Sequence, residues 1–84
     1  MESPYDEIRR AFRKGKRSGA THMLSVIDRF PWPQEDYITY VMPGEDVREK
    51  IEKYRKDMQD VIEVYNLSMD MESQISEKKP FHID

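Results

Sequence analysis

Two apolar runs separated by a proline-rich turn constrain the fold of this chain more than any other feature. Thr21–Phe30 and Asp36–Met42 are rich in β-branched and aromatic residues, which favour strands. Pro31, Trp32 and Pro33 stand between them, and two prolines stiffen a loop that is wider than a two-residue turn. The sequence therefore predicts an antiparallel hairpin, with its first strand covered on both faces for part of its length.

Helices are predicted on both sides of this hairpin. A helix over residues 4–17 begins after Ser3, a suitable cap, and Pro4 suits its first turn. A longer helix over residues 46–66 follows from apolar residues spaced four and three apart, at Val47, Ile51, Tyr54, Met58, Val61 and Tyr65. That stripe fits a helix lying across the sheet and also fits a coiled-coil seam. The predicted fold is α+β with the order α-β-β-α, its helices covering the hairpin.

The 84 residues are enough for one domain. Residues 1–67 are expected to form it, and residues 68–84 to form a short helix around Met71 and Ile75 or an extended tail. An isolated two-stranded hairpin is marginal in water, and both of its edges would expose unpaired backbone groups. We therefore expect a homo-oligomer, in which hairpins pair or stack and the long helices share a core.

Composition narrows the class of protein. The chain has no cysteine, so neither a disulfide nor a thiolate metal site is expected, which fits a reducing compartment. No apolar run reaches the ~20 residues of a membrane span, and the first ten residues, MESPYDEIRR, lack the apolar core of a signal peptide. The expectation is a soluble intracellular protein with no membrane partner.

Charge is distributed unevenly along the chain. The net charge is −3, yet residues 9–17 (RRAFRKGKR) carry six basic side chains and no acidic one. This stretch fits a solvated helix face, and it also fits a surface that meets a phosphate-bearing partner. Long nucleic acids are disfavoured as partners, because the chain is acidic overall and contains no recognised nucleic-acid-binding module.

No catalytic or metal-binding pattern is present. His22 and Asp28 share a strand face, but six residues at about 3.3 Å each put them ~20 Å apart, too far to hold one ion. Asp28 is expected to pair with a basic neighbour rather than to act as an acid or base. No nucleophile motif occurs, and three scattered glycines cannot form a phosphate-binding loop. We expect no enzyme activity, cofactor or metal.

Binding of a ligand is the more plausible role. Aromatic side chains on the hairpin could stack on bases, and Arg48 or the basic stretch at residues 9–17 could contact phosphates. Trp32 could equally fold back over the end of the hairpin. The candidate ligand-binding residues are Thr21, His22, Trp32, Asp36, Tyr37, Tyr40 and Arg48.

Three segments resemble a family of small proteins encoded by tailed phages: Gly19–Met23 (GATHM), Glu35–Tyr37 (EDY) and Val41–Lys50 (VMPGEDVREK). The similarity covers about residues 5–67. Two departures stand out, because residues 31–33 are richer in proline than the family's turn, and Ile38-Thr39 stands where a proline is common.

The resemblance implies a phage accessory protein in the cytoplasm of an infected bacterium. Small oligomeric phage proteins include sponges, which sequester the cyclic nucleotides that bacterial defence systems use as alarms. The hypothesis is therefore an anti-defence protein that binds a cyclic oligonucleotide signal without cleaving it. The alternative is an accessory protein that inhibits a host protein by binding to it directly.

Overall fold

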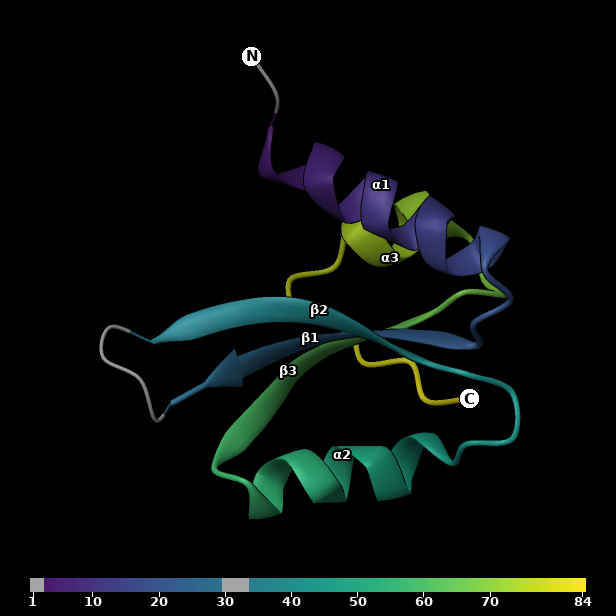
Figure 1. The fold of residues 1–84 in the computed structure, drawn as a ribbon. Helices are drawn as coiled ribbons and strands as arrows, with labels where there is room; N and C mark the ends of the chain where they lie inside the picture. The colour runs from purple at the N-terminus through teal and green to yellow at the C-terminus, as the bar shows by residue number, and fades with distance from the viewer. Residues whose placement is uncertain (1–2, 30–33) are drawn as a thin grey trace.

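The computed structural model describes residues 3–29 and 34–84, and places helices on both faces of a three-stranded sheet (Figure 1). The elements in chain order are α1 (Pro4–Arg17), β1 (His22–Asp28), β2 (Glu35–Val41), α2 (Val47–Lys56), β3 (Gln59–Asn66) and α3 (Met71–Ile75). The α+β class and the helix predicted over residues 4–17 are confirmed. Within the described ranges, no helix is both long enough and apolar enough to cross a membrane.

β1 is the central strand of the antiparallel sheet, whose order is β2-β1-β3. Its pairing with β2 sets His22 against Val41, which confirms the predicted antiparallel hairpin. Its pairing with β3 sets His22 against Asn66, with a register shift between Ser25 and Val26. The proline-rich turn of the hairpin falls outside the described residues.

The predicted helix over residues 46–66 is wrong in its second half. α2 ends at Lys56, and residues 59–66 form β3. Met58 has a backbone φ of +62°, a left-handed conformation that cannot continue a helix. The sequence of β3, QDVIEVYN, is rich in β-branched residues, and its apolar positions also satisfy the helical spacing. Residues 59–66 form a strand rather than a helix because they pair with β1.

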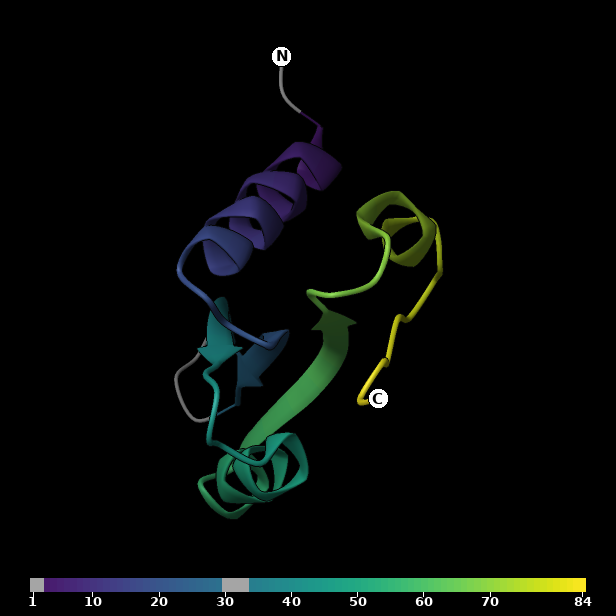
Figure 2. The same ribbon diagram turned by 90° about the vertical axis from the view of Figure 1, so that its right-hand side faces the viewer.

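The two faces of the sheet have separate hydrophobic cores (Figure 2). Leu24 and Val26 of β1 pack in the cluster that includes Ile51 of α2. Met23, which precedes Leu24 and faces the other side of the sheet, packs in the second cluster with Phe12 of α1. This alternation confirms that the first strand is covered on both faces.

The outer edge of β3 is occupied, in its C-terminal half, by the last part of the chain. The Gln74 side chain accepts a hydrogen bond from the Asn66 N–H (2.7 Å) and donates one to the Asn66 carbonyl (2.9 Å). Two residues earlier, the Val64 N–H donates to the Pro80 carbonyl and the Val64 carbonyl accepts from the His82 N–H, both at 2.9 Å. A side-chain amide and a short extended segment thus take the place of a neighbouring strand.

Residues 68–84 accordingly pack against the sheet. The short helix predicted around Met71 and Ile75 is α3, and Ile75 is buried in the core beneath α1. The premise of an isolated hairpin with two open edges is wrong, because β3 joins β1 and its own outer edge is hydrogen-bonded at Val64 and Asn66. Homo-oligomerisation stays a prediction.

Replacing Gln74 by Leu should lower the free energy of unfolding by about 2–4 kcal/mol, because it leaves the N–H and carbonyl of buried Asn66 without partners. Urea denaturation followed by circular dichroism measures the change. Gln34→Leu, at an exposed position, is the control and should change stability by less than about 0.5 kcal/mol. Equal effects of the two substitutions would contradict this account of the edge.

Candidate ligand-binding groove

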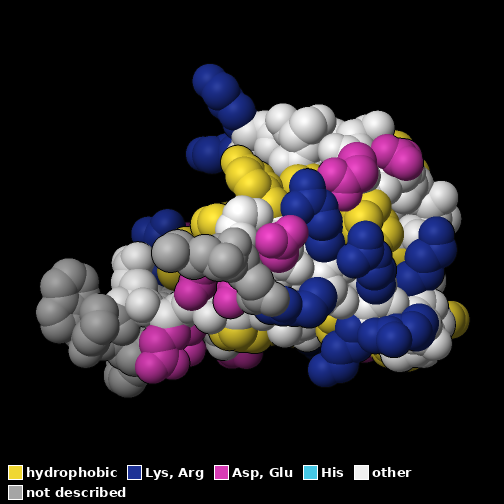
Figure 3. Space-filling model, turned by 90° about the horizontal axis from the view of Figure 1, so that it is seen from above, with side chains coloured by type: hydrophobic (Ala, Val, Ile, Leu, Met, Phe, Trp, Pro, Cys, Tyr) yellow, Lys and Arg dark blue, Asp and Glu magenta, His cyan; other side chains and the backbone are white. Residues whose placement is uncertain are grey.

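A groove of about 780 Å³ lies between α1 and β2. Five cationic side chains of α1 form one side of it, and apolar residues form the rest. Its lining residues are Arg10, Ala11, Arg13, Lys14, Lys16, Arg17, Ile38 and Tyr40. Figure 3 looks down onto this face and shows Lys and Arg side chains gathered there with hydrophobic surface between them. We call this feature the basic groove.

The close approach of Gly15 and Tyr40 fixes the position of α1 above β2. A Cβ atom at Gly15 would lie 2.4 Å from Cε1 of Tyr40 and 3.0 Å from Cδ1 of Leu67, so only glycine allows this packing. The Tyr40 hydroxyl donates to the Ala11 carbonyl at 2.6 Å. Burial raises the pKa of Tyr40, which keeps the hydroxyl protonated as a donor near neutral pH.

Gly15→Ala should destabilise the protein, although alanine favours a helix interior by about 1 kcal/mol over glycine. Overpacking against the Tyr40 ring outweighs that gain, and we expect a net loss of about 1–2 kcal/mol. Thermal and urea denaturation measure it. In a Tyr40→Ala background the loss should shrink or change sign. An increase in stability with Tyr40 present would contradict the proposed contact.

Arg9 belongs to the same basic stretch but holds α1 against α3. Its guanidinium makes two hydrogen bonds to the Glu72 carboxylate, both at 2.9 Å, and a third to Asp6 at 2.9 Å. The hydrogen bond from Arg9 lowers the pKa of Glu72. The backbone N–H of Ser3, followed by Arg9, lowers the pKa of Asp6. Arg9 therefore contributes to the packing of the helices, and the groove is lined by the cations that follow it.

The Arg9 contacts should make stability depend on pH. Carboxylates with lowered pKa values stabilise the fold above their unfolded pKa values, near 3.8 and 4.5, and this contribution is lost as pH falls through the folded values. Arg9→Gln should therefore lower the Tm at pH 7, and the difference from the unchanged protein should narrow below pH 4. Arg55→Gln, which removes an exposed pair with Glu52 inside α2, is the control. A Tm difference that stays constant with pH would contradict the assignment.

Thr21 and His22 lie at the start of β1, outside the basic groove. His22 Nε2 donates to the Ile83 carbonyl at 2.6 Å, and Nδ1 lies 2.9 Å from Thr21 Oγ1. The Thr21 hydroxyl in turn donates to the Val41 carbonyl at 3.1 Å. Both side chains are half-buried and hold the C-terminal segment to the sheet.

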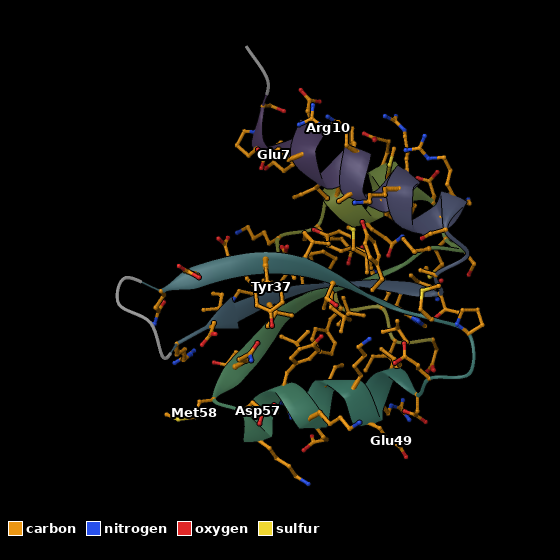
Figure 4. The ribbon with its side chains drawn as sticks, viewed as in Figure 1. Glu7, Arg10, Tyr37, Glu49, Asp57 and Met58 are labelled. Atoms are coloured by element: carbon orange, nitrogen blue, oxygen red, sulfur yellow. The ribbon has the colours of Figure 1, made fainter. Side chains whose placement is uncertain are left out.

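Asp36 and Tyr37 are neighbours on β2 whose side chains leave opposite faces of the sheet. Asp36 is exposed on the face of α1, in a hollow that Glu7 and Glu63 also line. The Tyr37 hydroxyl donates to the side chain of Gln59, and Figure 4 shows its ring below β2, on the side of α2. Burial, followed by the charge of Tyr54, raises the pKa of Tyr37.

Arg48 lies on α2, on the other side of the sheet from the basic groove. Its guanidinium lies 3.8 Å from the Asp84 carboxylate, and both side chains are largely exposed. Trp32 falls outside the described residues. Of the residues predicted from the sequence, the structure thus places Tyr40 in the groove and distributes the other described ones over three further surfaces.

Ile38 and Ala11 are groove residues that the sequence reasoning missed. Ile38 is two positions from Tyr40, so strand alternation could have placed it on the same face. Ala11 could be placed in the groove only once it was known which side of α1 faces the sheet. In residues 3–29 and 34–84, no three His, Cys, Asp or Glu side chains gather closely enough to hold a metal ion.

Comparison of this chain with known protein families, curated proteins and solved structures finds no match.

Proposed function

We propose that the protein binds a cyclic oligonucleotide signal in the basic groove and sequesters it without cleaving it, as an anti-defence protein of a phage in the cytoplasm of its bacterial host. The observation that carries the proposal is a row of cationic side chains facing apolar residues across one groove. Cationic side chains bind phosphates, and apolar or aromatic side chains provide a surface on which bases stack. The sequence resemblance to small phage proteins favours this class of ligand.

The size and charge of the groove fit a small anion. Its volume of about 780 Å³ lies within the range of pockets that hold small molecules, roughly 300–1,000 Å³. Its described lining residues include five cations and no acidic side chain, which favours binding of an anion although the whole chain has a net charge of −3. Arg13, Lys14 and Arg17 are the side chains that we expect to contact phosphates, with a base against Ile38 and Tyr40.

The lining residues also favour capture over cleavage. In the described part of the chain, the residues that line the groove include no histidine, carboxylate, serine or cysteine that could act as a base or nucleophile. The only hydroxyl among them belongs to Tyr40 and is engaged by the Ala11 carbonyl. A groove of this composition supplies affinity, and sequestration requires only that the protein outnumber the signal.

Titration of the purified protein with a panel of cyclic di- and trinucleotides, by isothermal titration calorimetry, tests the proposal. Arg13→Ala combined with Arg17→Ala should weaken binding by about 100-fold or more, because each charge-assisted contact contributes about 1.5–3 kcal/mol. Arg55→Ala, on α2, is the matched control and should leave affinity unchanged. Mass spectrometry of the released nucleotide should find it intact.

Two results would overturn the proposal. If none of the nucleotides binds, the proposed ligand class is wrong. If the released nucleotide is hydrolysed, the protein is an enzyme and not a sponge. Binding that is lost with Arg48→Ala but kept in the groove double variant would instead move the site to α2.

The alternative function is inhibition of a host protein by direct binding. Tyr37 and Ile38, whose side chains are exposed on β2, favour a surface of this kind. A stable complex with a purified host defence enzyme, without any nucleotide uptake, would favour it.

A further inference from the structure

β2 presents a row of backbone groups that point away from the sheet. Val64 uses its N–H and carbonyl on the outer edge of β3, so its partner Leu24 directs its own groups toward β2. Leu24 faces Thr39, and the groups of the next residue, Tyr40, therefore point outward. Lys50 Nζ donates to the Tyr40 carbonyl at 2.7 Å, which agrees with this direction. By alternation, the groups of Ile38 and Asp36 point outward as well.

In the described part of the chain, this edge is open at Asp36 and Ile38, while Lys50 Nζ occupies one side of the Tyr40 carbonyl. The C-terminal half of β3 is hydrogen-bonded on its outer side to Gln74 and to residues 80–82, whereas among the described residues no segment is hydrogen-bonded to the outward backbone groups of Asp36 and Ile38. Ile38 has 38% of its surface exposed at this edge. An exposed edge strand with a hydrophobic centre is a template for another strand.

The surface beside β2 carries opposite charges at its two ends. Toward the start of β2 lies an acidic hollow, which we define by Glu7, Asp36 and Glu63 among its lining residues. Toward the end of β2 lies the basic groove. Ile38 lines both features, so it stands at the boundary between negative and positive surface. Figure 4 shows Glu7 and Arg10 one turn apart on α1, with the acidic residue nearer the N-terminus.

We propose that two copies of this chain pair through β2, antiparallel and about a twofold axis at Ile38, forming one continuous sheet. This register sets Ile38 against Ile38 and Asp36 against Tyr40 of the other copy, with both of the latter on the α1 face. The acidic hollow of each copy then adjoins the basic groove of the other, so the twofold axis creates two identical contacts between opposite charges. A register that centres on Asp36 would instead oppose two like charges.

The pairing also changes the groove. Its lining comes from α1 and β2 alone, and the partner strand extends the β2 side with Asp36 and Ile38 of the second copy. Each groove thereby receives a carboxylate at its rim, which is suited to accept hydrogen bonds from the amino groups of a base. Because the pairing requires no ligand, its test is independent of the nucleotide titration.

Cysteine cross-linking tests the register directly, because the chain contains no cysteine. In an antiparallel hydrogen-bonded pair the two Cα atoms lie about 5.5 Å apart, a distance that a disulfide can span. Ile38→Cys should therefore oxidise to a covalent dimer in dilute solution. Ile62→Cys is the matched control, since Ile62 is equally exposed (38%) but lies on β3, and it should stay uncross-linked.

Sedimentation of the unmodified protein should show a dimer, and Ile38→Lys should raise its dissociation constant by about 100-fold, because two lysines would be buried face to face. Ile62→Lys should leave the dimer intact. Hydrogen exchange of the unmodified protein gives a readout without any variant, as the amides of Asp36, Ile38 and Tyr40 should slow with rising concentration.

A monomer at every concentration, or equal cross-linking at positions 38 and 62, would overturn the proposal. A dimer whose β2 amides stay unprotected would overturn the interface.

Discussion

The contact between Gly15 and the Tyr40 ring is the constraint on which the functional surface depends. Glycine in a helix interior costs about 1 kcal/mol relative to alanine, and here it lets α1 descend until the Tyr40 hydroxyl reaches the Ala11 carbonyl. The same contact brings the cationic end of α1 over an apolar part of β2. Without it, the basic side chains would be a solvated helix face, and with it they become one side of a groove.

Much of the fold could be predicted because its signals are local. The cap and the proline of α1 define its start, and the alternation in β1 indicates coverage on both faces. The error over residues 57–66 has a definite cause, since the apolar residues there satisfy both a helical and a strand period. One local signal favoured the strand, namely the β-branched composition of residues 61–64, whereas the break at Met58 is seen only in the backbone of the structure. The pairing of β3 with β1 is non-local, so no short window of sequence specifies it.

The candidate site was harder to predict than the fold. Tyr37 and Tyr40 are three residues apart on a strand, so strand geometry places their side chains on opposite faces and excludes them from one pocket within a single chain. The basic stretch at residues 9–17 was predicted as a possible phosphate-binding surface, but the sequence did not show which of its side chains face the groove. Arg9 turns toward α3 because Glu72 lies there, 63 residues away along the chain. The other cations line the groove because β2 happens to lie beneath them.

Gln74 and the C-terminal segment cover the outer edge of β3 at Val64 and Asn66, and this coverage bears on how many copies of the chain can assemble. A sheet with two free edges can add a neighbour on each side, and strand addition then continues into a filament. In the proposed dimer β2 is taken up by the other copy, and on β3 the backbone groups of Val64 and Asn66 already have partners, so further strand addition along that part of the sheet is blocked. The Gln74 amide and residues 80–82 thus stand where the backbone of a further molecule would have to bind, which favours a finite dimer over a filament.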